Sequence, residues 1–403
     1  MKQRYRFRFY PTHEQAHGLA CVFGSVRYVY NWALRLRTDA WHRGEKINYN
    51  QSSAALTVLK KKSDHDWLNE ISSVPTQQSL RHLQVAYQNF FEKRAEYPTF
   101  KKKSGKQLAE YTSSAFKWDA GNRNLSLAKM GRLNVRWSRT FKSVPTTVTV
   151  EKDAAGRYFV SLCLEETIQP LPKTGESIGV DLGINRLATL SNGQRIHNPR
   201  HTNKCSRKLA RAQKVLARRK QGSHRRNDQR LVVAKIQAKI ADTRTDYLHK
   251  VTTDLVRRFD TIAIEDLNVR GMVKNHNLAR AISDASFGAF GQMLTYKCNW
   301  YGKTLVKVDR FFPSSKRCSS CGHIVERLPL EIRVWVCPAC SAAHDRDENA
   351  ARNILAAGHA DNQNAQGGRV RPAKAKASKG SVRRTVNRSK KAALHLSSES
   401  PSL

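Results

Sequence analysis

Four of the chain's eight cysteines stand in two identically spaced pairs, and no other feature constrains the local fold as strongly. The pairs are Cys318-Ser-Ser-Cys321 and Cys337-Pro-Ala-Cys340, with fifteen residues between them. Each CxxC turn directs two thiolates to one side, and four thiolates complete a tetrahedral zinc site that has no open position. The spacing therefore predicts a structural zinc ribbon over 316–342, with redox-active cysteine pairs as the alternative.

The chain also carries more positive charge than any globular fold requires. It contains 72 Lys and Arg against 32 Asp and Glu, a formal net charge of +40 at pH 7. The excess is densest in residues 200–230, where twelve Lys and Arg accompany one acid at a spacing that favours one face of a helix. Since each neutralised phosphate releases counterions, we expect a long polyanionic partner; the alternative is a generic basic surface.

Length and hydropathy limit the class of protein. The 403 residues suffice for two or three domains. No apolar run reaches the roughly 18 residues that a membrane span needs, and the N-terminus, MKQRYRFRFY, does not have the pattern of a signal peptide. The cysteine pattern is typical of a reducing compartment and not of a disulfide framework.

Residue periodicity predicts one strand and several helices near the N-terminus. Residues 4–9 alternate aromatic residues with arginine, as in a strand with one buried and one cationic face. Thr12 and Gln15 form a capping box at the start of a helix. Residues 50–100 have helical apolar spacing, with one helix expected to begin at Thr76.

The middle of the chain changes to strand periodicity. Residues 132–137, 146–152 and 157–165 are rich in β-branched and aromatic side chains, with a hairpin turn at 153–156, and predict a small β-barrel together with the first strand. Prolines and a glycine at 169–176 indicate a domain boundary. Further along we expect a hairpin or meander after residue 177, a helix at 231–259, and strands at 259–267 and 304–312.

Three carboxylates lie at the ends of elements that are anchored in apolar sequence. Asp181 ends the strand IGVD, Glu265 ends the strand IAIE, and Asp347 begins the helix ENAARNIL. Taken singly, a strand-end Asp is usually a turn residue. As a set they can converge on hard cations, because Mg²⁺ prefers carboxylate oxygen and shares phosphate as a ligand. Two such ions can activate a water and stabilise the leaving oxygen of a phosphodiester.

Six segments share their order and spacing with one known family. They are FGSVRYVYN (23–31), IGVDLGINRLATL (178–190), IAIEDLNVRGM (262–272), FPSSKRC (312–318), the double CxxC, and HDRDENAARNIL (344–355). Together they resemble the TnpB (OrfB) family of transposon-encoded proteins, relatives of type V CRISPR effectors, over nearly the whole chain. Phe287 stands where this family commonly has Trp, which we expect to change packing only.

The resemblance implies a multidomain α+β protein with an RNase H-like (RuvC) α/β nuclease domain, an inserted zinc ribbon, a helical recognition lobe and a small oligonucleotide-binding-like wedge β-barrel. A C-terminal basic tail is too polar to fold, so we expect it to be disordered. The expected limits are 1–10 plus 110–172 for the wedge barrel, 11–109 for the recognition lobe, 173–315 plus 343–361 for the nuclease, 316–342 for the ribbon and 362–403 for the tail.

The same resemblance implies a metal-dependent, RNA-guided DNA endonuclease. A guide RNA from the transposon's right end would pair with double-stranded target DNA, while the protein would read a short adjacent motif. Carried over by motif, Asp181, Glu265 and Asp347 are the catalytic triad and the ligands of two Mg²⁺ ions; the four paired cysteines hold structural Zn²⁺. The family's third acid stands two positions before the Asn of NAA, which selects Asp347 over Asp345.

The resemblance also implies contacts and a location. Tyr49, Ser53 and Gln77 align with family positions near the adjacent DNA motif. We expect one protein chain per ribonucleoprotein, no membrane partner, and a prokaryotic cytoplasmic location that is nucleoid-associated when DNA is bound. Three alternatives stay open: a transposase that performs strand transfer with the same acids, a non-catalytic nucleic-acid-binding regulator of transposition, and an RNA-independent junction resolvase.

Overall fold

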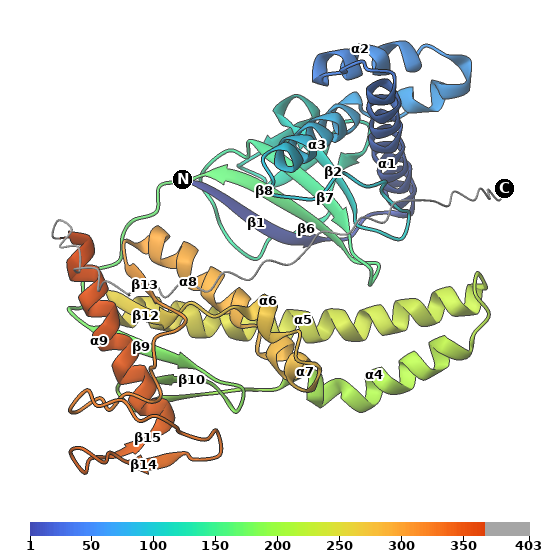
Figure 1. Cartoon of the computed structure of the whole chain (residues 1–403). Coiled ribbons are helices and arrows are strands. Elements are labelled where there is room, and N and C mark those ends of the chain that lie inside the picture. The colour runs from blue at the N-terminus through green and yellow to red at the C-terminus, as the bar shows by residue number, and fades with distance from the viewer. Residues whose placement is uncertain (367–403) are drawn as a thin grey trace, which may run out of the picture.

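A computed structural model describes residues 1–366 of the chain. Two five-stranded sheets organise these residues, and each sheet has its own covering helices and its own apolar core (Figure 1). An extended segment, residues 166–176, connects the two sheets at the predicted boundary. No helix in this part of the chain is both long and apolar enough to cross a membrane.

The first sheet consists of antiparallel strands. They are β1 (Lys2–Phe9), β2 (Gln107–Thr112), β6 (Val135–Arg136), β7 (Thr147–Lys152) and β8 (Tyr158–Glu165). Their order in the sheet is β2-β7-β8-β1-β6, with a hairpin between β7 and β8 as predicted. In β1, Phe7 and Phe9 are buried while Arg4 and Arg6 face solvent, which confirms the alternation seen in the sequence.

This sheet is open, and the predicted closed barrel is not observed. Its edge strands β2 and β6 form no ladder with each other within residues 1–366. Segment 132–137, expected as a single strand, is interrupted because the backbone N–H of Leu133 donates to the carbonyl of Leu125. The interruption leaves β6 too short to complete a barrel. A separate small sheet contains β3 (Phe116–Asp119), β4 (Asn124–Leu127) and β5 (Gly131–Arg132).

Helices α1 (His13–His42) and α3 (Ser73–Phe91) cover one side of the first sheet, and α2 (Tyr49–Leu59) packs on these two helices. The 3₁₀ turns are at Ser63–Asn69 and Ser113–Ala115. The capping box of Thr12 and Gln15 is present at the start of α1. The predicted start of α3 is wrong: its N-cap position is Ser72, and Thr76 is buried within the helix, where its hydroxyl donates to the carbonyl of Ser73.

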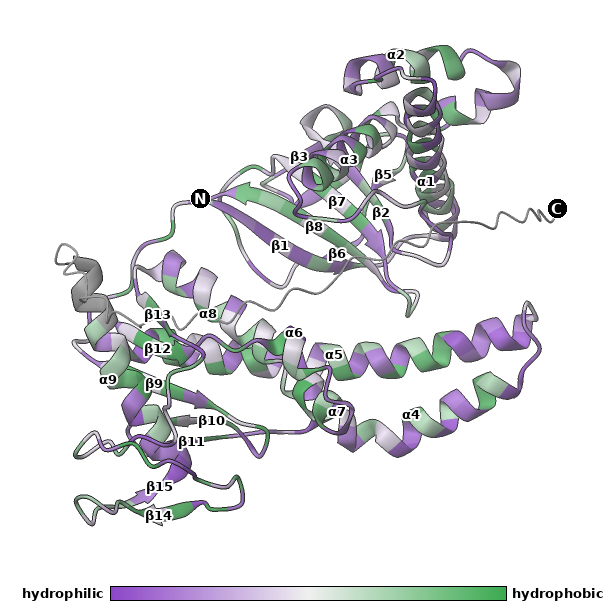
Figure 2. Ribbon diagram, in the orientation of Figure 1, coloured by the Kyte–Doolittle hydropathy of each residue, from purple (hydrophilic) through white to green (hydrophobic). Residues whose placement is uncertain are grey.

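The second sheet mixes antiparallel and parallel pairing. Its strands are β9 (Ser177–Leu182), β10 (Arg186–Leu190), β11 (Arg195–His197), β12 (Thr261–Glu265) and β13 (Thr304–Val308). In the order β11-β10-β9-β12-β13, the first three form an antiparallel meander, and β12 pairs in parallel with both β9 and β13. Both buried strands, β9 and β12, are strongly apolar (Figure 2).

Helices lie on both faces of the second sheet. The long helix α5 (His224–Arg258) and helix α8 (Phe287–Tyr301) pack on one face, and α9 (Arg346–Gln366) packs on the other (Figure 1). Phe287, the first residue of α8, is buried in the core of the second sheet, which fits a packing role at this position. The remaining short elements are α6 (Val269–Met272), α7 (His276–Ala285), β14 (Val334–Val336) and β15 (Ala343–Asp345).

One further expectation needs correction. The basic segment 200–230 is not one continuous helix: α4 (His201–Arg218) ends before a turn in which Gly222 has a φ of +82°, and α5 then runs back against α4. Helix α9 continues to Gln366. The rest of the predicted basic tail, 367–403, lies outside the described residues.

Candidate active site and metal centre

Two of the predicted acids lie on the same face of the second sheet. Side chains alternate along a strand, so Asp181 shares its face with Gly179, and Glu265 shares its face with Ala263. The opposite face carries apolar residues such as Ile262 that pack on α5 and α8. Because Val180 pairs with Ile264 in the parallel ladder, Asp181 and Glu265 extend from neighbouring strand ends toward the α9 side.

Small residues on this face let α9 approach the sheet very closely. A Cβ added at Gly179 would lie 2.0 Å from the carbonyl oxygen of Ala351, and one added at Gly358 would lie 2.6 Å from the Cβ of Ala263. These contacts fix α9 across β9 and β12. Asp347, in the first turn of α9, is thereby brought toward the two strand-end acids.

The three carboxylates interact electrostatically. Burial raises the pKa of Asp181 well above its usual range, and repulsion from Glu265 and from Asp347 adds to the rise. The structure therefore brings together acids that are far apart in the sequence. Their oxygens do not all lie within 4.8 Å of one another; among the described residues only the paired cysteines form such a group.

The two acids beside Asp347 have other partners. The side chain of Asp345 accepts hydrogen bonds from the backbone N–H groups of Asp347 and Glu348, at 3.1 and 3.0 Å, so it caps α9. It also pairs with Arg195 at 3.0 Å, and Glu348 pairs with Arg352 at 2.5 Å. Neither Asp345 nor Glu348 is among the charged groups that shift the pKa of Asp181.

The four paired cysteines gather into one cluster. The Sγ atoms of Cys318 and Cys340 are 3.6 Å apart, as are those of Cys321 and Cys337, and all four lie within 4.8 Å of one another. A tetrahedral zinc ion with Zn–S bonds of about 2.3 Å requires S–S separations of about 3.8 Å. Close contacts join one CxxC to the other and all four sulfurs lie together, so the arrangement fits a single metal ion better than two separate redox pairs.

The surroundings of the cluster favour metal ligation. Burial opposes ionisation of Cys318, but hydrogen bonds from backbone N–H groups and from His344 outweigh it and lower its pKa to about 5. The ring nitrogen Nε2 of His344 lies 3.0 Å from the Sγ of Cys318. His344 also packs on Trp335, which closes the hairpin of β14 and β15 over the sulfurs.

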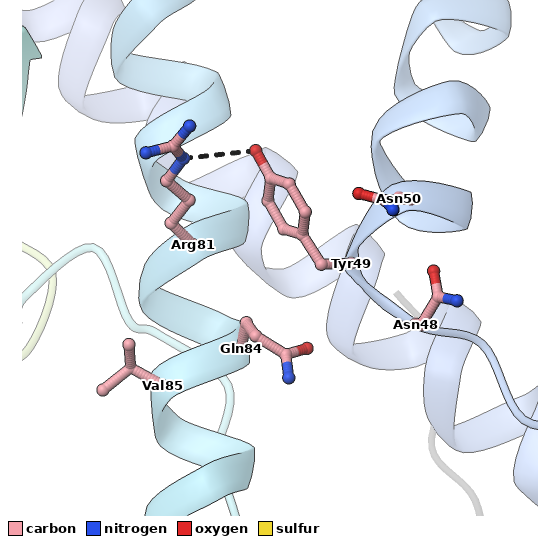
Figure 3. Close-up of a pocket in the computed structure, with 6 residues that line it drawn as sticks. All are labelled: Asn48, Tyr49, Asn50, Arg81, Gln84 and Val85. Carbon is pink, nitrogen blue, oxygen red and sulfur yellow. Dashed lines mark hydrogen bonds between the residues drawn. The ribbon is translucent and has the colours of Figure 1, made fainter.

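Helices α2 and α3 form an open cavity of about 540 Å³ (Figure 3). Its lining offers aromatic, amide and guanidinium groups from Tyr49, Arg81 and Gln84, and the Arg81 side chain donates to the Tyr49 hydroxyl at 3.3 Å. Tyr49 is the first residue of α2. The other two predicted contact residues lie outside the lining: Ser53 is partly buried one turn along α2, and Gln77 is exposed on α3.

The outer face of α4 is strongly basic. Its apolar side packs on α5, and its exposed side chains repeat every three or four positions (Figure 2). The exposed basic residues are Lys204, Arg207, Lys208, Arg211, Lys214 and Arg218. Such a cationic stripe can follow a phosphate backbone.

Comparison with protein families identifies three regions of the chain. A model described as "Probable transposase", for OrfB of IS605, matches residues 143–276. A model described as "Cas12f1-like, TNB domain" matches 287–354, which contains the cysteine cluster and Asp347. A "Helix-turn-helix domain" model of OrfB matches 1–46, although these residues here form β1 and the single helix α1.

Full-length relatives extend the match. A Streptomyces pristinaespiralis protein named "Putative RNA-guided DNA endonuclease" is 52% identical over 92% of each chain. An Escherichia coli K12 protein with the same name and the symbol InsQ is 33% identical, covering 89% of this chain and 92% of that one. A Cas12f1 structure, solved with guide RNA and target DNA, has the same overall fold at 11% identity, with a TM-score of 0.58 and coverage of 88% of this chain and 98% of that one. The chain therefore belongs to the TnpB (OrfB) family.

Proposed function

We propose that this protein is an RNA-guided DNA endonuclease that cleaves double-stranded target DNA beside a short adjacent motif. The observation that carries the proposal is the gathering of Asp181, Glu265 and Asp347 at one edge of the second sheet, where burial raises the pKa of Asp181 and repulsion from the other two acids adds to the rise. The names of the relatives from S. pristinaespiralis and E. coli support the same activity.

The topology supports an RNase H-like (RuvC) nuclease domain. An antiparallel meander of three strands followed by two parallel strands, with helices on both faces, is the arrangement this fold implies. In this proposal the nuclease domain is 173–315 plus 343–361, extended along α9. The first sheet and its small companion sheet act as the wedge, 1–10 plus 110–172, and residues 11–109 act as the recognition lobe.

The residues of the acid pocket fit hard divalent cations. Partly buried carboxylates that repel one another accumulate negative charge, which a cation such as Mg²⁺ relieves. A pair of Mg²⁺ ions, when bound, activates the attacking water and stabilises the leaving oxygen of a phosphodiester. Asp181, Glu265 and Asp347 would supply the oxygen ligands of these ions, and hydrolysis with the 3′ oxygen as the leaving group would give a 3′-hydroxyl and a 5′-phosphate.

The cysteine cluster has a structural role in this proposal. Four thiolates occupy every position of a tetrahedral zinc ion, so no position is available for substrate. The ribbon also connects to α9: the side chain of Asn349 accepts from the backbone N–H of Ser319 at 2.9 Å and donates to the carbonyl of Arg317 at 2.7 Å. Zinc binding thereby stabilises the start of the helix that carries Asp347.

The basic surface supports nucleic acids as partners. A net charge of +40 and the exposed stripe on α4 suit the backbones of a guide RNA, transcribed from the transposon's right end, and of a guide–target heteroduplex. The cavity between α2 and α3 suits base recognition, because amide and guanidinium groups match the edges of bases. We propose that Tyr49, with Ser53 and Gln77 nearby, contacts the adjacent DNA motif.

Cleavage of a guide-matched plasmid by the purified ribonucleoprotein tests the proposal. We expect the wild-type protein to cut the plasmid in Mg²⁺ and Asp181→Ala to leave it uncut while binding the co-purified RNA normally. Retained nicking by Asp181→Ala would remove this pocket as the nuclease centre. Joined DNA products instead of hydrolysed ends would favour the transposase activity that the description of one matching family model suggests.

A further inference from the structure

A buried serine contacts one of the three carboxylates. Ser314 is 7% exposed and lies in the loop between β13 and the cysteine cluster. Its Oγ donates a hydrogen bond to Oε1 of Glu265 at 2.5 Å. A hydroxyl bonded to a carboxylate at this length forms a strong, charge-assisted interaction. Glu265 is partly buried at the end of β12, and its side chain makes no other hydrogen bond or ion pair with the described residues.

The same serine is held from the opposite side by α9. Asn353 is 3% exposed, and its Nδ2 donates to the backbone carbonyls of Ser314 and Arg317, at 2.8 and 2.6 Å. Asn353 is on α9, whose first turn contains Asp347. Hydrogen bonds therefore connect α9, through Asn353 and Ser314, to Glu265, and link two acids that come from separate elements.

A simpler explanation of the hydrogen bond from Ser314 to Glu265 is that the buried hydroxyl of Ser314 needs some partner, as buried polar groups do. A backbone carbonyl, however, is the more common acceptor for a serine, and it would leave the Glu265 side chain free among its rotamers. Here the acceptor is a carboxylate of the proposed pocket. A pocket residue whose rotamer is fixed by a neighbour loses less entropy when its ligand binds.

We propose that Ser314 is a positioning residue that holds the carboxylate of Glu265 in the orientation required for cleavage. It acts through Glu265 and does not contact the DNA. This inference rests on the proposed nuclease function. Asn353 supports Ser314 from α9, so the orientation of Glu265 and the placement of Asp347 depend on the same set of hydrogen bonds.

Kinetics of the ribonucleoprotein on a guide-matched target test this role. We expect Ser314→Ala to lower kcat about 10- to 100-fold with KM for the target unchanged, as is usual when a group that orients a metal ligand is removed. Ser314→Thr keeps the hydroxyl and should recover most of the rate. Ser315→Ala is the matched control, because this neighbouring serine makes no hydrogen bond to Glu265, and it should match wild type in rate, zinc content and Tm.

A second measurement does not depend on turnover. Crystal structures should show one Glu265 rotamer in the wild-type protein and several in Ser314→Ala. A wild-type kcat for Ser314→Ala, or an unchanged Glu265 rotamer, would overturn the proposal. If Ser314→Ala does not fold, Ser314→Cys replaces it under the same criteria, since the thiol is a weak donor of similar shape. If the wild-type complex cleaves nothing, the nuclease function itself fails, and the Glu265 rotamers still decide whether Ser314 positions this side chain.

Discussion

The cysteine cluster and the acid pocket are assembled in different ways. The cysteines lie within 22 positions of one another and meet through two tight turns and one short hairpin. The acids come from β9, β12 and α9, and their proximity depends on the pairing of β9 with β12 and on the packing of α9 across both strands. One site therefore depends on local spacing, and the other depends on how closely a helix packs on a sheet.

Because the two sites are assembled differently, they should tolerate different substitutions. The cluster requires four particular side chains and the short turns and hairpin that carry them. The pocket also requires residues that make no chemistry of their own, such as Gly179, where α9 has room to approach. Substitutions should therefore affect the two sites unequally, and the two sites should influence each other through the contacts of α9 with the ribbon.

The largest effect is expected for Asp181→Asn. Cleavage should be lost, because a neutral amide is a poor ligand for Mg²⁺. The raised pKa of Asp181 means that the folded state disfavours the ionised carboxylate. The free energy of unfolding therefore falls as pH rises from the unfolded pKa of this group to its folded pKa. In Mg²⁺-free buffer at pH 7 the variant should therefore have a Tm a few degrees higher, measured by calorimetry.

Asp228→Asn, at an exposed position of α5, is the matched control and should change neither cleavage nor Tm. An Asp181→Asn protein that is less stable than wild type without Mg²⁺ would contradict the repulsion between the three carboxylates.

Cys337→Ser should have the next largest effect. Loss of one thiolate should reduce the zinc content, measured by atomic absorption, from about one ion per chain to nearly none. Because the ribbon is bonded to Asn349 of α9, cleavage should fall as well. Cys21→Ser, at an exposed cysteine far from the cluster in the sequence, should retain both zinc and activity. An active, zinc-free Cys337→Ser protein would show that the two sites are independent.

Gly179→Ala should have an intermediate effect. The added methyl group would collide with the backbone carbonyl of Ala351, which cannot move without shifting α9. Overpacking of this kind costs about 1–3 kcal/mol, and cleavage should fall while the zinc content stays normal. In Gly24→Ala the new Cβ has nothing within 4 Å, so this helical site should gain about 0.5–1 kcal/mol. Equal unfolding free energies for the two variants, measured in urea, would refute the close approach.

The smallest effect is expected for Arg333→Ala. Arg333 forms a partly exposed ion pair with Asp347 at 3.2 Å, and such pairs contribute at most about 1 kcal/mol. Stability and zinc content should barely change, and cleavage should fall at most a few-fold. A loss of cleavage as severe as that of Cys337→Ser would mean that the ribbon acts on Asp347 through this ion pair and not through the hydrogen bonds of Asn349.

Local patterns were sufficient where the structure is local. The cysteine spacing predicted the cluster, and the alternation in β1 predicted its buried phenylalanines. The predicted start of α3 at Thr76 is too late, because a helix accepts proline, here Pro75, in its first turn, where the N–H has no intrahelical partner. The open first sheet depends on pairing between distant strands, which short windows of sequence do not encode.

The acids illustrate the same limit. Each carboxylate was visible in the sequence at the end of an apolar element, and the set indicated a cation site, but the resemblance to a family was needed to choose Asp347 over Asp345. Side chains alternate along a strand, so Asp181 lies on the same face as Gly179, and Glu265 on the same face as Ala263. That this face is the one covered by α9 becomes clear only from the structure. The bond between Ser314 and Glu265 had no sequence signal, because it depends on the conformation of one loop.

Anomalous diffraction from crystals soaked in Mn²⁺ tests the central claim most directly. The account predicts Mn²⁺ at the edge of the second sheet, with oxygen atoms of Asp181, Glu265 and Asp347 among its ligands. Mn²⁺ that is absent from this edge, or bound there without any contact to Asp347, would contradict the convergence of the three acids on one cation site.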